Sequence, residues 1–368
     1  MDTEFEIFFA TAPGLEQVLA EEATALGFVT PEILKGGVAT RGGWPDVWRA
    51  NLQLRGANRV LARIGSFRTM HLAQLDKRMR KFPWGDVLRV DVPVKVEVMC
   101  KKSRIYHAGA AAQRVERAIT EEHGAEISKD AALKIMIRIE DDLCTISIDT
   151  SGELLHKRGH KVAVGKAPMR DTLASLFLRQ CGYDGQEPVY DPMCGSGTFL
   201  IEAAEIAGGL NPGRTRAFGF EQLQTFDADE WAAIKAIDTT RASDQRFYGS
   251  DRDAGAVRMS TENAERAGVD GACSFEALAF ADVQAPEGPK GLVMVNPPYG
   301  ARIGSKKTLY PVYAQLGTML KERFKGWRVG VVTSDASLAN TMGLKFLEQT
   351  RPVSNGGLKV SLYRTGRL

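Results

Sequence analysis

Hydrophobic and polar positions follow two different patterns along the 368 residues of this chain. Up to about residue 155, segments with alternating apolar side chains are interspersed with segments whose apolar side chains recur at helical spacing. These patterns predict strands over residues 5–10, 90–98, 135–139 and 144–148, and helices over 46–63 and 108–122. Helices and strands mixed in this way are typical of α+β modules.

From about residue 168 onward, short apolar strands alternate with helical segments. The apolar segments predict five strands, over residues 188–190, 246–249, 275–279, 291–295 and 328–333. Two more strand candidates, 346–351 and 358–363, flank an Asn-Gly pair that is typical of a hairpin turn. The second half is therefore predicted to be α/β, with a mostly parallel sheet of seven strands that ends in an antiparallel hairpin.

Composition adds a few expectations. Hydrophobic residues make up 44% of the chain and charged residues 25%, which is ordinary for a globular protein. No run of about 18 apolar residues predicts a membrane span, and the acidic first residues do not resemble a targeting peptide. The five cysteines are scattered without a Cys-x-x-Cys pair, which favours a reducing compartment and predicts a cytoplasmic protein.

Two histidines have a spacing that can hold a metal ion on a helix. His156 and His160 are four residues apart, but Lys157, Arg158 and Lys161 surround them and no carboxylate is near. We therefore expect no metal site.

The net charge of +3 hides an asymmetry along the chain. Residues 41–110 carry 15 lysines and arginines against 5 acidic residues, whereas the remainder carries 33 against 40. A basic block of domain size predicts contact with a polyanion, here RNA or DNA. The alternative is a solvated basic surface without a partner.

A glycine-containing turn follows the first strand of the second half. Residues 191–198 have the sequence DPMCGSGT and lie between a predicted strand and a predicted helix. Glycines allow the backbone to approach a ligand, and the N-terminus of a helix offers free N–H groups. The segment lacks the third glycine of a dinucleotide fingerprint, because residue 200 is Leu, and it lacks the lysine of a P-loop. The pattern favours a nucleotide-like cofactor over a tight turn without a ligand.

Two more acidic residues follow successive strands of the same predicted sheet. A carboxylate at Asp251 can accept hydrogen bonds from both hydroxyls of a ribose, and Asp282 is placed to accept one from an adenine amino group. A single acid of this kind is usually a solvated loop residue. Three acids at successive strand ends are much less expected by chance.

The fourth strand is followed by Asn296, Pro297, Pro298 and Tyr299. An aromatic amine is a poor nucleophile, and the Asn296 side-chain oxygen and the Pro297 carbonyl can accept its two N–H groups. The prolines hold this geometry rigidly, and Tyr299 can stack on a flipped base. The alternative is a proline-rich turn with a core tyrosine.

These motifs together resemble those of bacterial THUMP-domain RNA methyltransferases that use S-adenosylmethionine. The chain is most similar to the guanine-N2 methyltransferases of large-subunit rRNA, in their short form with one methyltransferase domain. The resemblance rests on the two motifs above and on residues 12–17, 51–60, 102–107, 155–160 and 167–174. It implies a ferredoxin-like module over 1–60, a THUMP RNA-binding domain over 61–155, and a Rossmann-like class I methyltransferase domain over 160–368.

The resemblance also implies a role for each site residue. Asn296, Pro297, Pro298 and Tyr299 would position a guanine amino group. The cofactor would be bound by Pro168, Thr172, Asp191, Pro192, Cys194, Gly195, Gly197, Thr198, Asp251 and Asp282. RNA phosphates would be contacted by Lys101, Lys102, Arg104 and Arg158. No base is paired with Cys194 in the sequence, so we interpret it as a packing residue and not a nucleophile.

Several alternatives stay open. A tRNA guanine-N2 methyltransferase has the same parts, and methylation of glutamine amides uses the same Asn-Pro-Pro-Tyr motif. A non-catalytic RNA-binding assembly factor is the third possibility. The aromatic residues Phe218, Phe220, Phe226 and Trp231 can either stack on RNA bases or cover a core, and their spacing favours the core. Since the chain stops after the hairpin, we expect one methyltransferase domain and one modification.

Overall fold

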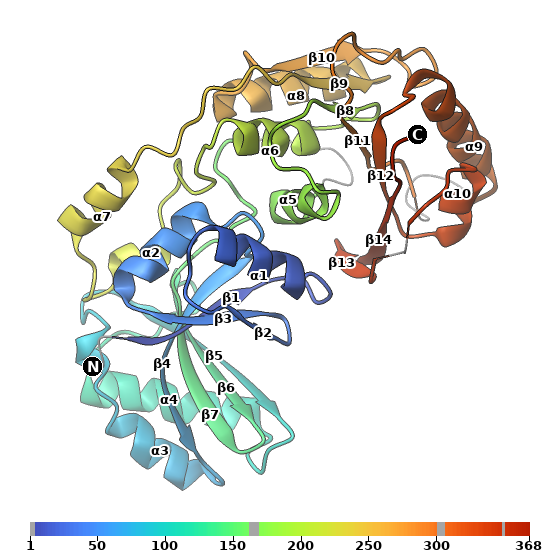
Figure 1. The fold of residues 1–368 in the computed structure, drawn as a ribbon. Helices are drawn as coiled ribbons and strands as arrows, with labels where there is room; N and C mark the ends of the chain where they lie inside the picture. Colours follow the sequence, from blue (N-terminus) through green and yellow to red (C-terminus); the bar gives the residue numbers. More distant parts are fainter. Residues whose placement is uncertain (1–3, 162–168, 300–305, 348–349) are drawn as a thin grey trace. The chain divides into compact units, whose positions relative to one another are not determined.

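The computed structural model describes residues 4–161, 169–299, 306–347 and 350–368. Its contacts divide the chain into two compact units (Figure 1). The first unit comprises Met1–Thr11, Leu19–Leu155 and Arg216–Asp238, and the second comprises Ala12–Val18, His156–Thr215 and Thr239–Leu368.

The first unit is built on one seven-stranded sheet in the order β2-β3-β1-β4-β7-β6-β5. Its strands are β1 (Phe5–Ala10), β2 (Glu32–Leu34), β3 (Gly37–Gly42), β4 (Arg59–Arg68), β5 (Val94–Lys101), β6 (Leu133–Glu140) and β7 (Leu143–Asp149). The neighbouring strands are antiparallel except for β5 and β6, which are parallel. Strand β4 pairs with β1 on one side and with β7 on the other, so it joins the two predicted N-terminal modules into one sheet.

The helices of the first unit pack in two groups. They are α1 (Glu16–Ala25), α2 (Trp44–Gln53), α3 (Leu72–Arg80), α4 (Ala108–Glu122) and α7 (Ala228–Ala236), with short 3₁₀ turns at Trp84–Asp86 and Gly219–Gln222. The first residues of α1, up to Val18, are grouped with the second unit. Helix α3 packs against α4, and α4 packs against β5, whereas α2 packs against α7 (Figure 1).

Two predicted elements of this unit differ from the structure. The helix predicted over residues 46–63 is wrong in its second half, since α2 ends at Gln53 and β4 begins at Arg59. The chain becomes extended at Leu54, and Val60 and Ala62 are buried because β4 pairs with β1. The strand predicted over 90–98 begins later, at Val94. Apolar residues at short spacings fit both periodicities, and the sheet partner decides between them.

An aromatic cluster joins residues 216–238 to the first unit. Phe218, Phe220 and Trp231 are buried, and the ring of Phe220 lies 6.0 Å from that of Trp48 on α2. The interpretation of these aromatic side chains as core residues is confirmed. By its contacts this segment belongs to the first unit, although it lies within the range predicted for the methyltransferase domain.

The second unit is built on a seven-stranded sheet in the order β10-β9-β8-β11-β12-β14-β13. Its strands are β8 (Val189–Asp191), β9 (Phe247–Asp251), β10 (Cys273–Ala277), β11 (Leu292–Val295), β12 (Arg328–Thr333), β13 (Val353–Asn355) and β14 (Leu358–Arg364). The first five in this order are parallel, and β14 is antiparallel to both β12 and β13. This arrangement confirms the predicted mostly parallel sheet with a C-terminal antiparallel hairpin.

The strand predicted over 346–351 is wrong in the residues that the structure describes there, since Phe346 makes only an isolated bridge to Thr365 and the first strand of the hairpin is β13. The two turn residues are Gly356 and Gly357, and Asn355 pairs with Leu358 as the last residue of β13. Both glycines have positive φ angles, of 57° and 87°, as a tight hairpin turn requires.

Helices cover both faces of the second sheet (Figure 1). They are α5 (Asp171–Gln180), α6 (Thr198–Ala207), α8 (Ala254–Ala267), α9 (Lys306–Arg323) and α10 (Ala336–Thr341). Helix α6 packs against α5 and α8, and α9 packs against α10. A core cluster links α9 with β11 and β12 through buried side chains such as Val293, Tyr313 and Val331. No helix among the described residues is long and apolar enough to cross a membrane.

Candidate active site

The predicted site residues of the second unit gather at the carboxyl edge of its parallel strands. Asp191 ends β8, Asp251 ends β9, and Asn296 directly follows β11. Strand β8 lies between β9 and β11 in the sheet, so the three strand ends are adjacent. Ligands of open α/β sheets bind at this edge. The topology therefore brings together residues that are more than 100 positions apart in the sequence.

Asp282 follows β10, at the end of the sheet. Its carboxylate is exposed in a loop that Arg323 holds from α9. The Arg323 guanidinium donates hydrogen bonds to the carbonyls of Ala281 and Val283, at 2.7 and 2.8 Å. The backbone on both sides of Asp282 is thus fixed while its side chain stays accessible.

The turn after β8 is open on one side. Gly195 and Gly197 have φ angles of +56° and +78°, which favour glycine at both positions. A Cβ atom on Gly195 would meet no described atom within 4 Å, whereas one on Gly197 would lie 3.2 Å from Ser260. Gly197 is therefore needed for packing, and Gly195 exposes backbone that a ligand can approach. Helix α6 begins directly afterwards at Thr198, with its free N–H groups at this turn.

Neighbouring side chains hold the turn in place. The backbone N–H of Gly195 donates to Asp251 at 3.1 Å, and the Ser260 hydroxyl donates to the Gly195 carbonyl at 2.8 Å. The Asn263 side chain donates to the Ser196 carbonyl at 3.1 Å. Ser260 and Asn263 were not predicted. Their signal in the sequence is two polar residues three positions apart on the face of a helix that becomes buried.

Asp191 is a buried carboxyl with few partners. It is 2% exposed and accepts a hydrogen bond from the backbone N–H of Met193 at 3.0 Å. Burial and, to a smaller extent, the nearby Asp251 carboxylate raise the pKa of Asp191 to about 8, against the lowering effect of the Met193 hydrogen bond. A positively charged ligand group beside Asp191 would favour its ionised form.

The pKa of Asp191 predicts how stability changes with pH in the absence of a ligand. This carboxyl loses its proton near pH 3.8 in the unfolded chain and near pH 8 in the folded one, so the folded chain binds one more proton between these values. Asp191 therefore contributes stability at low pH that is lost as the pH rises towards 8, by at most about 1.4 kcal/mol per pH unit.

We expect Asp191→Asn to remove this loss. Urea unfolding of the two proteins without ligand, followed from pH 5 to pH 9, should give a stability difference in favour of the variant that grows up to about pH 8. Asp184→Asn is the control, because Asp184 is an exposed aspartate of the same unit. A constant difference between Asp191→Asn and the parent across this range would contradict the prediction.

The Asn-Pro-Pro-Tyr segment places an unsatisfied acceptor at the same edge. The Oδ1 atom of Asn296 is buried and has no hydrogen-bond partner among the described residues. Pro297 is buried, and Tyr299 is partly exposed. A buried acceptor without a partner is costly in a folded protein, so a ligand donor is the natural partner of Asn296.

Two side chains that the sequence does not predict as site residues form hydrogen bonds to this segment. The hydroxyl of Tyr313 on α9 lies 3.3 Å from the Pro298 carbonyl and 3.0 Å from the Thr333 hydroxyl at the end of β12. The Asn355 side chain donates to the Tyr299 hydroxyl at 3.4 Å. Apolar spacing marks Tyr313 as a core residue, and nothing in the sequence shows that its hydroxyl meets this segment.

Lys161 is another residue that the sequence did not single out. Its ammonium group donates to the Thr198 hydroxyl at 2.7 Å and to the Met169 carbonyl at 2.8 Å, and it lies 3.3 Å from Asp171. It thus links the start of α6 with the start of α5. Thr172 follows Asp171 on the first turn of α5, and its side chain is buried. Pro168 lies outside the described residues.

The other residues predicted for the cofactor turn are mostly buried. Pro192 and Cys194 are buried, and burial raises the pKa of the Cys194 thiol above its usual range. A thiol with a raised pKa is a poor nucleophile, which agrees with its interpretation as a packing residue.

Arg158 differs from the prediction that it contacts RNA. Its side chain is 1% exposed and its Nε donates to Glu202 on α6 at 2.9 Å. A buried guanidinium with a carboxylate partner is not accessible to phosphates, so Arg158 has a structural role in the second unit. Lys101, Lys102 and Arg104 are exposed in the first unit, as a phosphate contact requires.

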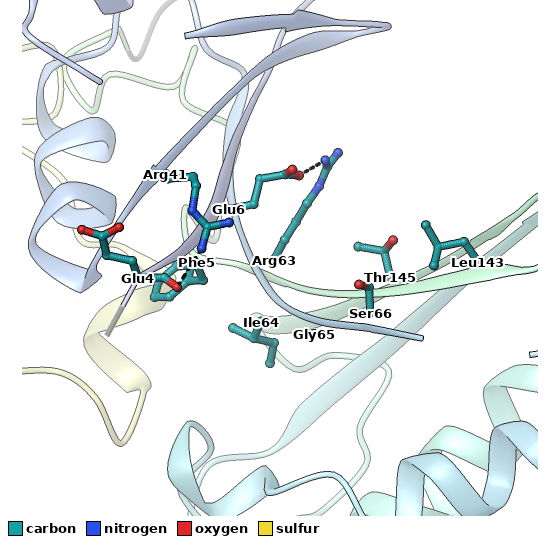
Figure 2. Close-up of a pocket in the computed structure, with 10 residues that line it drawn as sticks. All are labelled: Glu4, Phe5, Glu6, Arg41, Arg63, Ile64, Gly65, Ser66, Leu143 and Thr145. Carbon is teal, nitrogen blue, oxygen red and sulfur yellow. Dashed lines mark hydrogen bonds and ion pairs between the residues drawn. The ribbon is translucent and has the colours of Figure 1, made fainter. Parts of the chain in front are cut away.

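The first unit also has a cavity of about 560 Å³ of its own. Residues of β1, β3, β4 and β7 line it, and Figure 2 shows Arg41 and Arg63 among them, with Arg63 paired with Glu6. None of the predicted site residues lines this cavity. In the part of the chain that the structure describes, no group of three or more side chains is arranged to hold a metal ion.

Fold and site together define a class I methyltransferase. The strand order, the glycine turn after β8 and the Asn-Pro-Pro-Tyr segment after β11 are all features of its parallel sheet. The chain belongs to the family described as "RMKL-like, methyltransferase domain", which matches residues 158–364, and residues 6–61 match the "RlmL ferredoxin-like domain".

Individual relatives agree with this assignment. The chain is 32% identical to a putative RNA methyltransferase of Synechocystis, over 97% of this chain and 96% of the relative. It is also 32% identical to the ribosomal RNA large subunit methyltransferase K/L of Methylococcus capsulatus, over 97% of this chain but only 50% of the relative. Among solved structures, a putative methyltransferase in complex with SAH superposes with a TM-score of 0.89, at 25% identity, and covers 100% of this chain and 99% of the other. The chain therefore spans nearly all of one relative and about half of another.

The methyl donor of this fold class is S-adenosylmethionine, and the site has the features that such a donor needs. The turn at Gly195 leaves space for a ligand, and Asp251 presents a carboxylate at the strand end where ribose hydroxyls bind. The carboxyl of Asp191 is suited to the positive charges of the donor. The residues present thus fit the cofactor.

Proposed function

We propose that the protein transfers a methyl group from S-adenosylmethionine to the exocyclic N2 amino group of a guanine in large-subunit ribosomal RNA. The observation that carries this proposal is the buried Oδ1 atom of Asn296, an acceptor without a partner at the edge where the cofactor site lies. A flat ring with an amino group supplies the N–H donor that this acceptor lacks. The curated relatives that are named as rRNA methyltransferases support RNA as the substrate.

In this proposal, the residues after β11 bind the base and the residues at the neighbouring strand ends bind the cofactor. Asn296 and the Pro297 carbonyl would each accept one N–H of the amino group and so direct its lone pair away from the ring. Tyr299 would stack on the flipped base, and the two prolines would keep the acceptors in position without reorganisation. The bound cofactor supplies an electrophilic methyl group, and Asp191, Gly195, Gly197 and Asp251 would hold it at the adjacent strand ends.

Substrate binding is assigned to the first unit. We propose that residues 61–155 form a THUMP domain and that Lys101, Lys102 and Arg104 contact RNA phosphates. All three side chains are exposed at the end of β5 or just after it. Phosphate contacts position a nucleic acid but carry no sequence information, so the target guanine is selected elsewhere.

The test is nucleoside mass spectrometry of large-subunit rRNA and tRNA, purified separately from a deletion strain and its parent. Loss of N2-methylguanosine from the rRNA alone supports the proposal. Loss from tRNA alone would transfer the activity to tRNA. An unchanged N2-methylguanosine content in both, with another methylated base lost, would show that the site acts on a different amino group.

Tyr313 is a further positioning residue for this reaction. Tyr313→Phe removes the hydroxyl beside the Pro298 carbonyl, so the segment loses a support while the ring still fills the core. We expect kcat to fall by about tenfold, the effect of roughly one hydrogen bond to a preorganised group, with little change in the KM for RNA.

Tyr310→Phe is the matched control for this prediction. Tyr310 lies on the same helix but contacts the Ser337 hydroxyl instead, at 2.9 Å. Its substitution should leave kcat near the parental value. Equal losses in both variants, or a Tyr313→Phe loss that follows thermal stability only, would show that the hydroxyl has no role in positioning.

A further inference from the structure

An aromatic side chain of the first unit is exposed to an unusual extent. The side chain of Tyr106 is 84% exposed, more than that of any other large hydrophobic residue that the structure describes. It lies between the end of β5 at Lys101 and the start of α4 at Ala108. A single exposed aromatic residue is common on protein surfaces, so a function for Tyr106 depends on the groups that surround it.

The backbone around Tyr106 is fixed although it is not in a helix or strand. Ile105 is buried at 4% exposure, and His107 caps α4 by accepting a hydrogen bond from its first turn at 3.0 Å. The backbone N–H of Arg104 donates to Asp142 at 2.8 Å, and the Ser103 hydroxyl accepts from the Asp142 N–H at 3.1 Å. Tyr106 therefore stands on a preorganised support, which lowers the entropy cost of binding a partner.

Three segments meet at the loop that carries Tyr106, and together we call them the tyrosine tip: residues 68–71, 101–107 and 140–143. The Thr69 N–H donates to the Asp142 carbonyl at 2.9 Å, and the Arg104 guanidinium contacts the sulfur of Met70 at 3.2 Å. The tip thus combines an aromatic ring and a thioether with several charged groups. Its parts come from β4, β5 and the turn between β6 and β7.

Some of the positively charged side chains of the tyrosine tip remain exposed to solvent. Glu140 is engaged by Lys101 at 2.8 Å and by Arg138, and these contacts lower its pKa to about 2. Arg104 is 68% exposed, with Asp142 3.9 Å from its guanidinium. Lys102 is exposed and has no ion pair among the described residues. Its φ angle of +47° places it in the left-handed region, where a lysine is uncommon, and this turn leads the chain towards Tyr106.

We infer that Tyr106 is a stacking platform for an unpaired base of the RNA substrate, with Lys102 and Arg104 on the flanking phosphates. The inference rests on the proposed function, because that function makes RNA the partner. An aromatic face beside accessible cations is the combination that binds single strands, whereas a duplex offers its phosphates but keeps its base faces stacked. Protein interfaces are enriched in Tyr, Met and Arg but depleted of lysine, and the exposed Lys101 and Lys102 of the tip therefore favour RNA over a protein partner.

The test measures binding of the full-length protein to fluorescein-labelled oligoadenylate of about 12 nucleotides and to a blunt RNA duplex of similar length. Tyr106→Ala should weaken single-strand binding by about tenfold and leave duplex binding unchanged, because stacking on one base is lost. Tyr106→Phe keeps the ring and should bind like the parent. Val90→Ala is the control, since Val90 is 60% exposed in the same unit and precedes the opposite end of β5.

Each other outcome overturns the inference. Parental single-strand affinity of Tyr106→Ala, or failure of the parent to bind the strand at all, would show that the ring is not a platform. Equal losses in Tyr106→Ala and Tyr106→Phe would assign the effect to the hydroxyl. If Tyr106→Ala impaired methylation only of rRNA that carries ribosomal proteins, the tip would be a protein-docking surface.

The outcome is independent of the methyl transfer itself. Binding is measured without S-adenosylmethionine, so a protein that stacks the strand but methylates no rRNA would refute the proposed function alone. Conversely, normal rRNA methylation together with parental strand binding by Tyr106→Ala would refute only the role of Tyr106.

Discussion

Replacing Asn296 with alanine should lower kcat for rRNA methylation by about 10²–10³-fold, the usual cost of removing one preorganised acceptor or donor from a reacting centre. The Oδ1 atom that is lost is buried and has no partner within the described chain, so it is available to the amino group of the base. Affinity for S-adenosylmethionine should stay unchanged, because Asp191 and Asp251, which we propose to hold the cofactor, lie on other strands.

Single-turnover methylation and calorimetry of cofactor binding, measured on the same preparations, separate the two effects. Asn296→Asp retains an acceptor oxygen and should keep more activity than the alanine variant. Asn340→Ala, at an exposed position on α10, controls for the loss of an asparagine amide. Methylation by Asn296→Ala at the parental rate would show that the assigned role is wrong.

The second large effect concerns the cofactor. Asp251→Ala should raise the Kd for S-adenosylmethionine by at least about 10²-fold, because it removes the carboxylate proposed to accept from two ribose hydroxyls, and such hydrogen bonds contribute about 1.5–3 kcal/mol each. It also frees the Gly195 N–H, which Asp251 holds at 3.1 Å. Both changes weaken cofactor binding, so we expect a large increase in the Kd for S-adenosylmethionine and a smaller decrease in kcat at saturating cofactor.

A neighbouring aspartate provides the control. Asp253 caps α8 by accepting from the Gly255 N–H at 2.8 Å, and Asp253→Asn keeps that acceptor. Calorimetric titration with S-adenosylmethionine should show parental affinity for Asp253→Asn and weak binding for Asp251→Ala. Equal affinities of Asp251→Ala and the parent would place the ribose elsewhere at this edge.

The motifs of the methyltransferase domain were visible in the sequence because they depend on local rules. A glycine turn between a strand and a helix requires positive φ angles at Gly195 and Gly197, and the C-terminal hairpin requires them at Gly356 and Gly357. Alternating strands and helices specify a parallel sheet, whose carboxyl ends meet at one edge. The fold class could therefore be predicted before any contact was known, and the family followed from the resemblance of the motifs.

The boundary of the first unit shows where local rules are insufficient. Residues 59–63 have apolar spacings that suit a helix, but pairing of β4 with both β1 and β7 makes them a strand. Residues 216–238 lie between two segments of the second unit in the sequence, yet their aromatic side chains pack with Trp48 of the first unit. Long-range pairing and packing outweigh local preference in both cases.

The sequence by itself determined which residue types stand at the strand ends and that the chain has the parts of an RNA methyltransferase. Only the tertiary structure decided that Arg158 is buried against Glu202, that Lys161 and Tyr313 support the site, and that Tyr106 is presented to solvent. The physical reason is that burial and hydrogen bonding depend on which segments meet in space. A basic or aromatic residue has the same letter whether it faces a carboxylate, a core or a strand of RNA.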